Sequence, residues 1–304
     1  MPRVSIGLPV YNGENYLKDA VDSILNQTFE DFELIISDNA STDSTRDICE
    51  DYTQKDRRIR YFRNGINLGA TLNYNRTYNL SNGKYFKWIA HDDLISPAYL
   101  EECVKSLDCN KDAVLSFPQI TYIDETGRVL VSPPGGLSIR SANPAERLKQ
   151  FVKFESKSND IFWAIFGLIR SDVLRKTGLF GRYIANDQVL LTKILLAGPF
   201  YEVPEKMYFR RIHPNASTIK LPKISCFERA RWYDTTDRPK LVLPNWKLLL
   251  EDLNAIRELD MDKQVKARCY LMIARMFANR WKRLALEMSS LPSQFIIRRT
   301  VKPF

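Results

Sequence analysis

Three consecutive polar residues, His91, Asp92 and Asp93, directly follow the apolar stretch 85–90. Two adjacent carboxylates at the end of a buried strand are costly unless a cation or hydrogen-bond donors meet them. Mg²⁺ and Mn²⁺ take oxygen ligands and usually leave coordination positions open for substrate phosphates. The motif therefore predicts a metal and diphosphate site. The alternative is a solvated loop that caps the next helix, because Asp and the Ser-Pro pair at 96–97 are common at helix starts.

The first 110 residues, which must position this motif, alternate between strand-like and helix-like segments. Such alternation is typical of right-handed βαβ units around a parallel sheet. Four short, mostly apolar stretches are predicted to be strands: residues 4–9, 32–37, 59–63 and 85–89. Ligands bind such sheets at the carboxyl ends of strands. We therefore expect the polar segments 9–12, 38–43 and 91–93 to converge on one crevice.

The polar turn 38–43 offers groups that suit a nucleoside. Asp38 can accept a hydrogen bond from a base N–H, and the Asn, Ser and Thr side chains beside it can bond ribose hydroxyls. The sequence has neither a G-x-G-x-x-G fingerprint nor a G-x-x-x-x-G-K-[ST] loop. A bound nucleotide would thus be held by carboxylates and a metal rather than by a glycine cradle. The alternative is a plain turn with a helix N-cap.

Several motifs, in order along the chain, resemble family 2 glycosyltransferases, which have the GT-A fold. The run 4–12 (Val-Ser-Ile-Gly-Leu-Pro-Val-Tyr-Asn) looks like the opening of that family, and the strand and acidic turn 33–43 match its next segment. The motifs that follow in the family's order are Asn67-Leu68-Gly69, Asn82-Gly83-Lys84-Tyr85, and His91-Asp92-Asp93 with Pro97 and Leu100. The resemblance covers roughly residues 3–215.

The resemblance implies an α/β fold of the GT-A type, a Rossmann-like mixed, mainly parallel sheet with flanking helices, plus a C-terminal helical extension. It implies an inverting, hexosyltransferase-like enzyme that moves a sugar from a nucleoside-diphosphate donor, UDP-linked, to a hydroxyl of a glycan or lipid-linked glycan in polysaccharide or cell-surface glycan biosynthesis. The predicted catalytic domain spans 1–220, with a nucleotide-binding part (1–110) and an acceptor-binding part (111–220). A basic helical region covers 221–304.

The same resemblance assigns roles to single residues. Asp38 would bind the base, Asp92 would lie near the ribose, and Asp93 would bind the Mn²⁺ or Mg²⁺ that bridges the diphosphate. The other nucleotide-binding residues would be Pro9, Tyr11, Asn12, Asn39, Ser41 and Asn67. Many members carry a further acidic residue where this chain has Ala90 and His91. Which of His91 and Asp92 contacts the ribose is therefore open.

A catalytic base and a second metal ligand are predicted beyond residue 180. Inverting transfer needs a carboxylate that takes a proton from the acceptor hydroxyl. The family places this base in an acidic pair at a helix start; here Asn186 replaces the first member and Asp187 keeps the second. Asp187 is thus the predicted base, with a structural cap as the alternative. His213, after a predicted edge strand, matches the family's Arg-x-x-His pattern, in which the His can ligate the metal; the alternative is a surface or hydrogen-bonded His.

Two arginines precede that histidine. Arg210 and Arg211 have planar donors that suit a phosphate, so both are candidate diphosphate contacts.

The basic charge of the chain is concentrated at its C-terminal end. Of the net charge of +9, residues 222–304 carry +8, with 17 Lys and Arg against 9 Asp and Glu. Helices are predicted over 223–233, 245–259 and 262–288. We expect the apolar stripe of the last helix to pack on the catalytic domain, and the basic, aromatic tail around 295–299 to contact an anionic membrane surface weakly. Nucleic acid is not an expected partner, because no binding motif accompanies the charge.

Composition places the protein in a reducing compartment. Its five cysteines are odd in number, scattered and free of C-x-x-C pairs. No signal sequence or membrane-spanning run is expected, so the predicted location is cytoplasmic or peripheral at the inner face of the membrane. Two rival functions are a metal-dependent nucleotidyltransferase and a non-catalytic sugar-nucleotide-binding protein. The sugar, the acceptor, the linkage and the oligomeric state are not predicted.

Overall fold

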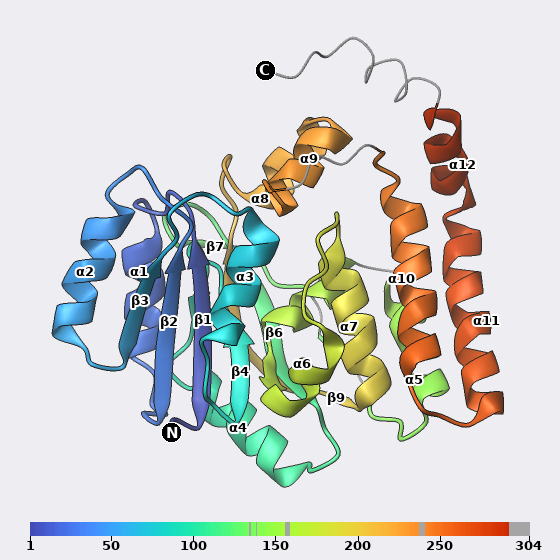
Figure 1. Cartoon of the computed structure of the whole chain (residues 1–304). Coiled ribbons are helices and arrows are strands. Elements are labelled where there is room, and N and C mark those ends of the chain that lie inside the picture. Colours follow the sequence, from blue (N-terminus) through green and yellow to red (C-terminus); the bar gives the residue numbers. More distant parts are fainter. Residues whose placement is uncertain (134, 138, 156–158, 237–240, 292–304) are drawn as a thin grey trace.

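The structure is a computed structural model of the chain. It describes residues 1–133, 135–137, 139–155, 159–236 and 241–291. In this part, one mixed sheet with the strand order β3-β2-β1-β4-β8-β6-β9-β5 is flanked by helices, and β7 pairs with β6 (Figure 1). The predicted α/β class with a C-terminal helical extension is confirmed. No helix of the described part is long and apolar enough to cross a membrane.

The first half of the sheet is parallel, as the sequence predicts. Strand β1 pairs with β2 on one side and with β4 on the other, and β2 pairs with β3. Every residue of β1 and β2 is buried, so the apolar runs read from the sequence form the centre of a two-sided layer. The elements of this half are β1 (Val4–Val10), α1 (Leu17–Leu25), β2 (Phe32–Asp38), α2 (Thr45–Lys55), β3 (Ile59–Arg63), α3 (Ala70–Asn79) and β4 (Tyr85–Trp88).

The second half mixes strand directions. Strand β8 runs antiparallel to both β4 and β6, whereas β6 and β9 are parallel. The elements are β5 (Leu94–Ile95), α4 (Tyr99–Cys109), β6 (Leu115–Ile123), β7 (Val129–Val131), α5 (Pro144–Glu155), η1 (Asn159–Phe166), β8 (Leu168–Arg170), α6 (Ser171–Thr177), α7 (Asn186–Ala197) and β9 (Phe200–Arg211). Since β9 pairs with β6 and with β5, it is an internal strand, and the expectation of an edge strand was wrong.

The C-terminal segment is helical, with one break that the sequence did not reveal. It contains α8 (Ser217–Lys220), η2 (Leu221–Lys223), α9 (Cys226–Tyr233), α10 (Pro244–Glu258), α11 (Lys263–Asn279) and α12 (Trp281–Ser289). The single helix predicted over 262–288 is two helices, because Arg280 leaves helical geometry with φ −99° and ψ 9°. Its guanidinium pairs with Glu155 of α5, which is a tertiary contact.

These helices share a hydrophobic core with the second half of the sheet. Ile256 of α10 and Ile273 of α11 are fully buried together with Leu191 and Leu195 of α7. The expectation that the stripe of the last helix packs on the catalytic domain is confirmed, since Cys269, Met276 and Phe277 are buried there. The core thus continues past residue 220, where the sequence suggested a domain boundary. Residues 295–299, the predicted membrane-binding tail, lie outside the described residues.

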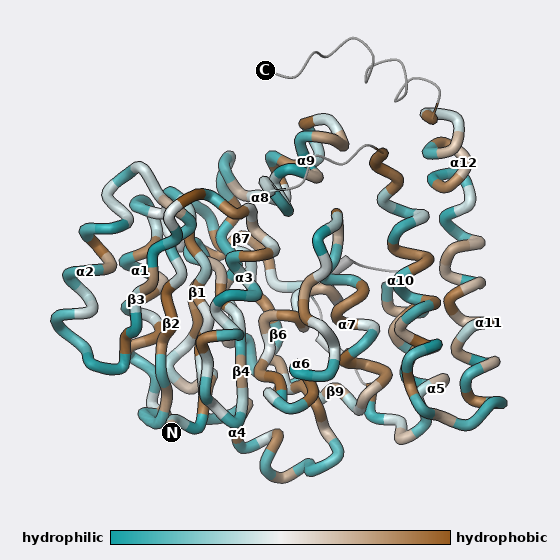
Figure 2. Tube along the Cα trace, in the orientation of Figure 1, coloured by the Kyte–Doolittle hydropathy of each residue, from teal (hydrophilic) through white to brown (hydrophobic). Residues whose placement is uncertain are grey.

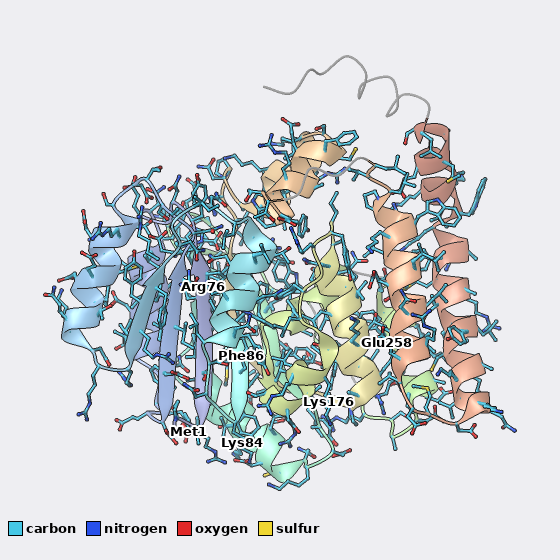
Figure 3. All side chains as sticks on the ribbon, in the orientation of Figure 1. Met1, Arg76, Lys84, Phe86, Lys176 and Glu258 are labelled. Carbon is cyan, nitrogen blue, oxygen red and sulfur yellow. The ribbon has the colours of Figure 1, made fainter. Side chains whose placement is uncertain are left out.

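Hydrophobic residues follow the strands, and the covering helices are amphipathic. Figure 2 shows hydrophobic colouring along β1 and β2 and mainly hydrophilic colouring in α2. In Figure 3, the side chains fill the space between β4 and the neighbouring helices, where Phe86 packs edge-on against Tyr78 and Trp88. Lys84 marks the start of β4 at the lower end of the molecule in that view. The carboxyl ends of the parallel strands lie at the opposite end.

Candidate functional site

The acidic motif lies where β4 ends and β5 begins. Asp93 is buried, and its carboxylate accepts hydrogen bonds from the Tyr208 hydroxyl (2.6 Å) and from the Arg211 backbone N–H (3.0 Å). Burial and the negative charge of Asp92 raise the pKa of Asp93 to about 7. Strand β9, which brings Tyr208 and Arg211, thus anchors the second carboxylate of the motif.

Asp92 faces a different partner. Its Oδ2 atom lies 2.9 Å from Nε2 of His213, which is buried just after β9. Burial alone would raise the pKa of Asp92, but the His213 hydrogen bond and the charges of His91 and His213 together lower it. The carboxylate that meets the predicted histidine ligand is therefore that of Asp92, whereas Asp93 lies behind it.

This donor set fits a hard divalent cation that relies on its substrate for further ligands. Among the residues described, no group of three or more His, Cys, Asp or Glu side chains converges on one point. Asp92 and His213 provide one oxygen and one nitrogen donor that already lie in contact. Mg²⁺ and Mn²⁺ sites with one or two carboxylates are usually completed by substrate phosphates and water. The ligand roles predicted for Asp93 and His213 stay predictions.

A lysine supports the motif from within the sheet. Lys87 of β4 is fully buried, and its Nζ donates to the Trp88 carbonyl at 3.0 Å. The ammonium also lies 4.6 Å from the ring centre of Tyr99 and 5.6 Å from that of Tyr208, which holds Asp93. Burial lowers the pKa of Lys87 to about 7. The acidic motif therefore lies next to a buried lysine that packs against the tyrosine holding Asp93.

The predicted base lies at the start of α7. The residue before this helix, Ala185, has φ 59°, which turns the chain sharply into the helix. Asn186, buried, donates to Thr71 Oγ1 at 2.9 Å and to the Gly181 carbonyl at 2.6 Å, so it fixes the turn rather than the chemistry. Burial raises the pKa of Asp187, while hydrogen bonds from the backbone N–H groups at the helix start oppose the shift.

The two candidate phosphate arginines have different environments. Arg211 is 2% exposed, and its guanidinium donates to the Asp92 carbonyl (3.0 Å), the Glu125 carbonyl (2.9 Å) and Asp19 Oδ2 (3.1 Å). Those contacts make it a brace for the motif. The Arg210 guanidinium stacks on the Trp163 ring, 3.5 Å from its centre, and donates to the Thr218 hydroxyl at 2.7 Å. In the described part of the chain, Arg210 thus meets fewer protein acceptors than Arg211, and the phosphate roles of both stay predictions.

The loops after β1 and β2 form a closed network of hydrogen bonds. The Asn39 side chain donates to Asn67 Oδ1 (2.9 Å) and to the Gly69 carbonyl (3.2 Å), and accepts from Asn64 (2.9 Å) and from the Leu68 N–H (2.9 Å). Each polar atom of Asn39 is therefore engaged within the protein. Its predicted role in nucleotide binding, like that of Asn67, stays a prediction.

Asp38 and Ser41 belong to the same network. The carboxylate of Asp38 is fully buried and accepts from the Ser41 N–H (2.8 Å) and the Tyr61 hydroxyl (2.8 Å), with Arg63 Nε at 3.2 Å. Ser41 Oγ in turn accepts from the Asn12 N–H at 2.9 Å. These contacts hold the strand ends in register.

One large cavity lies between the sheet and the C-terminal helices. Its volume is about 1250 Å³, and Asp92, Asp93, Asp187, Arg210 and Arg211 all line it. The residues predicted for the nucleotide site other than Asp92 are not among the lining residues: Pro9 and Asp38 lie near the ends of β1 and β2, and the others lie in loops, at Tyr11, Asn12, Asn39, Ser41 and Asn67. His213 does not line the cavity either, although it contacts Asp92. The structure thus brings the predicted metal ligand Asp93, the two candidate phosphate arginines and the predicted base to one cavity.

Several residues that line the cavity were not predicted from the sequence. Tyr74 of α3 lines the cavity, and burial raises its pKa, with smaller contributions from the charges of Asp92, Asp93 and Asp187. Three others, which lie on one face of α9, are Arg229, Trp232 and Tyr233. Their i, i+3, i+4 spacing is a visible signal, but the sequence does not reveal which surface that face meets.

Comparison with known proteins identifies the family of the chain. Residues 5–178 match the model of glycosyl transferase family 2, so the chain belongs to that family. An uncharacterized glycosyltransferase from Methanocaldococcus jannaschii is 38% identical over 131 residues, which are 42% of this chain and 45% of the relative. One from Rickettsia felis is 38% identical over 230 residues, 72% of this chain and 36% of the relative. The chain therefore spans less than half the length of these two relatives.

Solved structures support the fold. TarS from S. aureus, in complex with UDP-GlcNAc, has a TM-score of 0.66 at 16% identity, over 90% of this chain and 72% of that one. A mannosyltransferase from Pyrobaculum calidifontis, in complex with GDP-Man and Mn²⁺, has a TM-score of 0.53 at 16% identity, over 99% of this chain and 81% of that one. At this identity, the likeness concerns the GT-A fold.

Proposed function

We propose that the chain is an inverting, metal-dependent glycosyltransferase that uses a nucleoside-diphosphate sugar, UDP-linked, and a hydroxyl of a glycan or lipid-linked glycan. One observation carries this proposal: Asp92 and Asp93, which follow β4, line the same cavity as Asp187 at the start of α7. Family membership and nucleotide-sugar complexes of proteins with the same fold support it.

The donor would lie at the acidic end of the cavity. Asp92 and His213, with Asp93 beside them, would hold Mn²⁺ or Mg²⁺, which when bound neutralises charge that develops on the leaving diphosphate. Arg210 would contact the diphosphate, held in place by the Trp163 ring. The loops around Asp38 would contact the nucleotide base of the donor.

Asp187 would act on the acceptor. A raised pKa makes a carboxylate a stronger base, and burial provides this shift here. Asp187 would take the proton of the acceptor hydroxyl while that oxygen attacks the anomeric carbon from the side opposite the leaving diphosphate. Tyr74, which lines the same cavity, would shape the space that the sugar occupies.

A screen of nucleotide sugars tests the proposal. Thermal unfolding of the full chain is measured with each donor, with and without Mn²⁺, because a ligand that binds the folded state raises its melting temperature. We expect a UDP-sugar to give a larger shift with Mn²⁺, and slow donor hydrolysis to release UDP. Release of pyrophosphate from a nucleoside triphosphate would instead favour a nucleotidyltransferase, and binding without any turnover would favour a non-catalytic protein.

Weak binding to an anionic membrane surface is a further part of the proposal. Helix α12 presents Trp281, Leu286 and Met288, which are 60%, 68% and 47% exposed, next to Lys282 and Arg283. Such a mixture suits a membrane interface. Flotation with phosphatidylserine vesicles should recover the protein, and Trp281→Ser should reduce recovery. Equal flotation with neutral vesicles would contradict the electrostatic part.

A further inference from the structure

The end of the cavity beyond Asp187 is basic and aromatic. Helix α9 contributes Arg229, Trp232 and Tyr233 to it, and α12 contributes Lys282 and Arg283. Within the described part of the chain, neither Lys282 nor Arg283 forms an ion pair, whereas Arg280 beside them pairs with Glu155. A surplus of positive charge therefore faces this end of the cavity.

Arg229 has an unused donor at this end. Its Nε atom is buried and has no hydrogen-bond partner among the described residues. A buried donor without a partner is costly, and an anion bound beside the guanidinium would offset part of that cost. The planar guanidinium suits an oxyanion such as a phosphate or carboxylate, to which it can donate two parallel hydrogen bonds.

Helix α9, which carries Arg229, ends next to the residues that hold the start of α7. The backbone of Tyr233 packs closely against Gly69, and two residues further on Thr71 accepts a hydrogen bond from Asn186, directly before Asp187. Burial and the charge of Asp187 raise the pKa of Tyr233, and the charge of Arg229 lowers it. Arg210 instead reaches the cavity from the end of β9, next to the acidic motif.

We infer that the acceptor is an anionic glycan, and that Arg229 binds a phosphate or carboxylate close to the hydroxyl that Asp187 deprotonates. This inference rests on the proposed function, because it assigns the Asp187 side to the acceptor. Trp232 is 40% exposed at the cavity and forms an edge-on pair with Tyr233, which gives the sugar ring of the acceptor an aromatic surface. Lys282 and Arg283 attract the anion from the far wall.

The test compares two arginines of one helix. Arg229→Gln removes the inferred anion contact, and Arg231→Gln is the matched control, since Arg231 is exposed on α9 and does not line the cavity. Each full-length protein is saturated with UDP and Mn²⁺ and then titrated with glucose, glucuronate or glucose 6-phosphate at constant ionic strength. Binding is followed by thermal shift.

We expect both anionic sugars to bind the starting protein and Arg231→Gln better than glucose does. Arg229→Gln should lose about tenfold in affinity for the anionic sugars, as for one charged hydrogen bond, with the response to glucose and UDP unchanged. Arg229→Lys, which keeps the charge, should retain part of the preference for anionic sugars over glucose. This variant shows whether the loss of affinity in Arg229→Gln reflects misfolding. The stronger of the two anions identifies phosphate or carboxylate.

Three results would overturn the inference. One is an equal response to all three sugars in the starting protein, and another is an equal loss in both arginine variants. The third is a parallel loss of UDP binding in Arg229→Gln, which would assign this arginine to the donor diphosphate. A failure of the proposed function is distinguishable, because the starting protein would then not respond to nucleotides with Mn²⁺ before any sugar is added.

Discussion

The loops at the ends of β1 and β2 and the cavity beside α7 are built in opposite ways. The loops consist of polar side chains that bond one another, so that Asn39 alone makes four hydrogen bonds within the protein. The cavity is lined by charged and aromatic side chains, and Arg229 keeps one buried donor that has no partner among the described residues. One region uses its polar groups to fix the backbone, and the other holds polar groups ready for a ligand.

The largest effect, on the turnover rate, is expected when the predicted catalytic base is replaced. Asp187→Asn should lower the turnover rate by about 10²–10⁴-fold, because the general base is lost, while UDP affinity stays unchanged. Asp172→Asn is the control, since Asp172 is an exposed first-turn acid of α6 outside the cavity. Steady-state transfer rates and UDP calorimetry measure both effects. Full turnover by Asp187→Asn would exclude this base.

The loop network should be broken at Asn39. Asn39→Ala leaves its buried partners unsatisfied and should lower the free energy of unfolding by about 2–4 kcal/mol. Urea unfolding of this variant and of Asn15→Ala, which changes an exposed residue beside the same loops, gives the difference. If the two variants were equally stable, the network would not be what holds the loops together.

The free energy of unfolding should depend on pH through a buried carboxyl group between two helices beside the cavity. Asp252 of α10 is buried against α7, and one of its carboxylate oxygens has no hydrogen-bond partner among the described residues. Burial raises its pKa to about 7, although a hydrogen bond with Thr192 opposes this. The folded state therefore keeps the proton that the unfolded state loses near pH 4, so stability falls as the pH rises from about 4 to 7.

Asp252→Asn should remove the part of that fall that Asp252 contributes, which is on the order of 4 kcal/mol. Asp93, whose pKa burial also raises to about 7, should leave a smaller fall of the same sign. Urea unfolding at several pH values between 4 and 8 measures the difference, with Asp260→Asn, an exposed position at the end of the same helical segment, as the control. An equal pH dependence in Asp252→Asn and in the starting protein would place its origin elsewhere.

The smallest effect separates the two arginines next to the acidic motif. Arg210→Gln should weaken UDP binding by about three- to tenfold with little change in stability, because its contacts are a ring and one hydroxyl at the surface. Arg211→Gln should mainly lower stability, since Arg211 is buried and braces Asp92. Calorimetry with UDP and urea unfolding on both variants reveal the split. The reverse pattern would exchange the two roles.

Prediction succeeded where the signal is local. The four parallel strands were found from apolar runs, and the polar residues after them lie at the expected ends. The fold class and the family were accessible for the same reason, because several short motifs occur in order. Asp92, Asp93 and Asp187 were selected individually, and all three line the cavity.

Prediction failed where contacts between residues far apart in the sequence determine the structure. The break at Arg280 follows from packing against α5, and β9 became internal because β5, which was not predicted, pairs with it. The sequence placed the metal role on Asp93, but it did not show that Tyr208 and Arg211 would engage that carboxylate.

The sequence alone determined the strands, the acidic motif at a strand end and the base candidate at a helix start, because hydrophobic period and turn chemistry act over a few residues. Only the tertiary structure decided that Asp92, rather than Asp93, meets His213, and that α9 and α12 close the cavity with Arg229 and Arg283. Those contacts join residues far apart in the sequence, such as Asp92 and His213, which are 121 positions apart. They depend on how whole elements pack, and no local pattern encodes that.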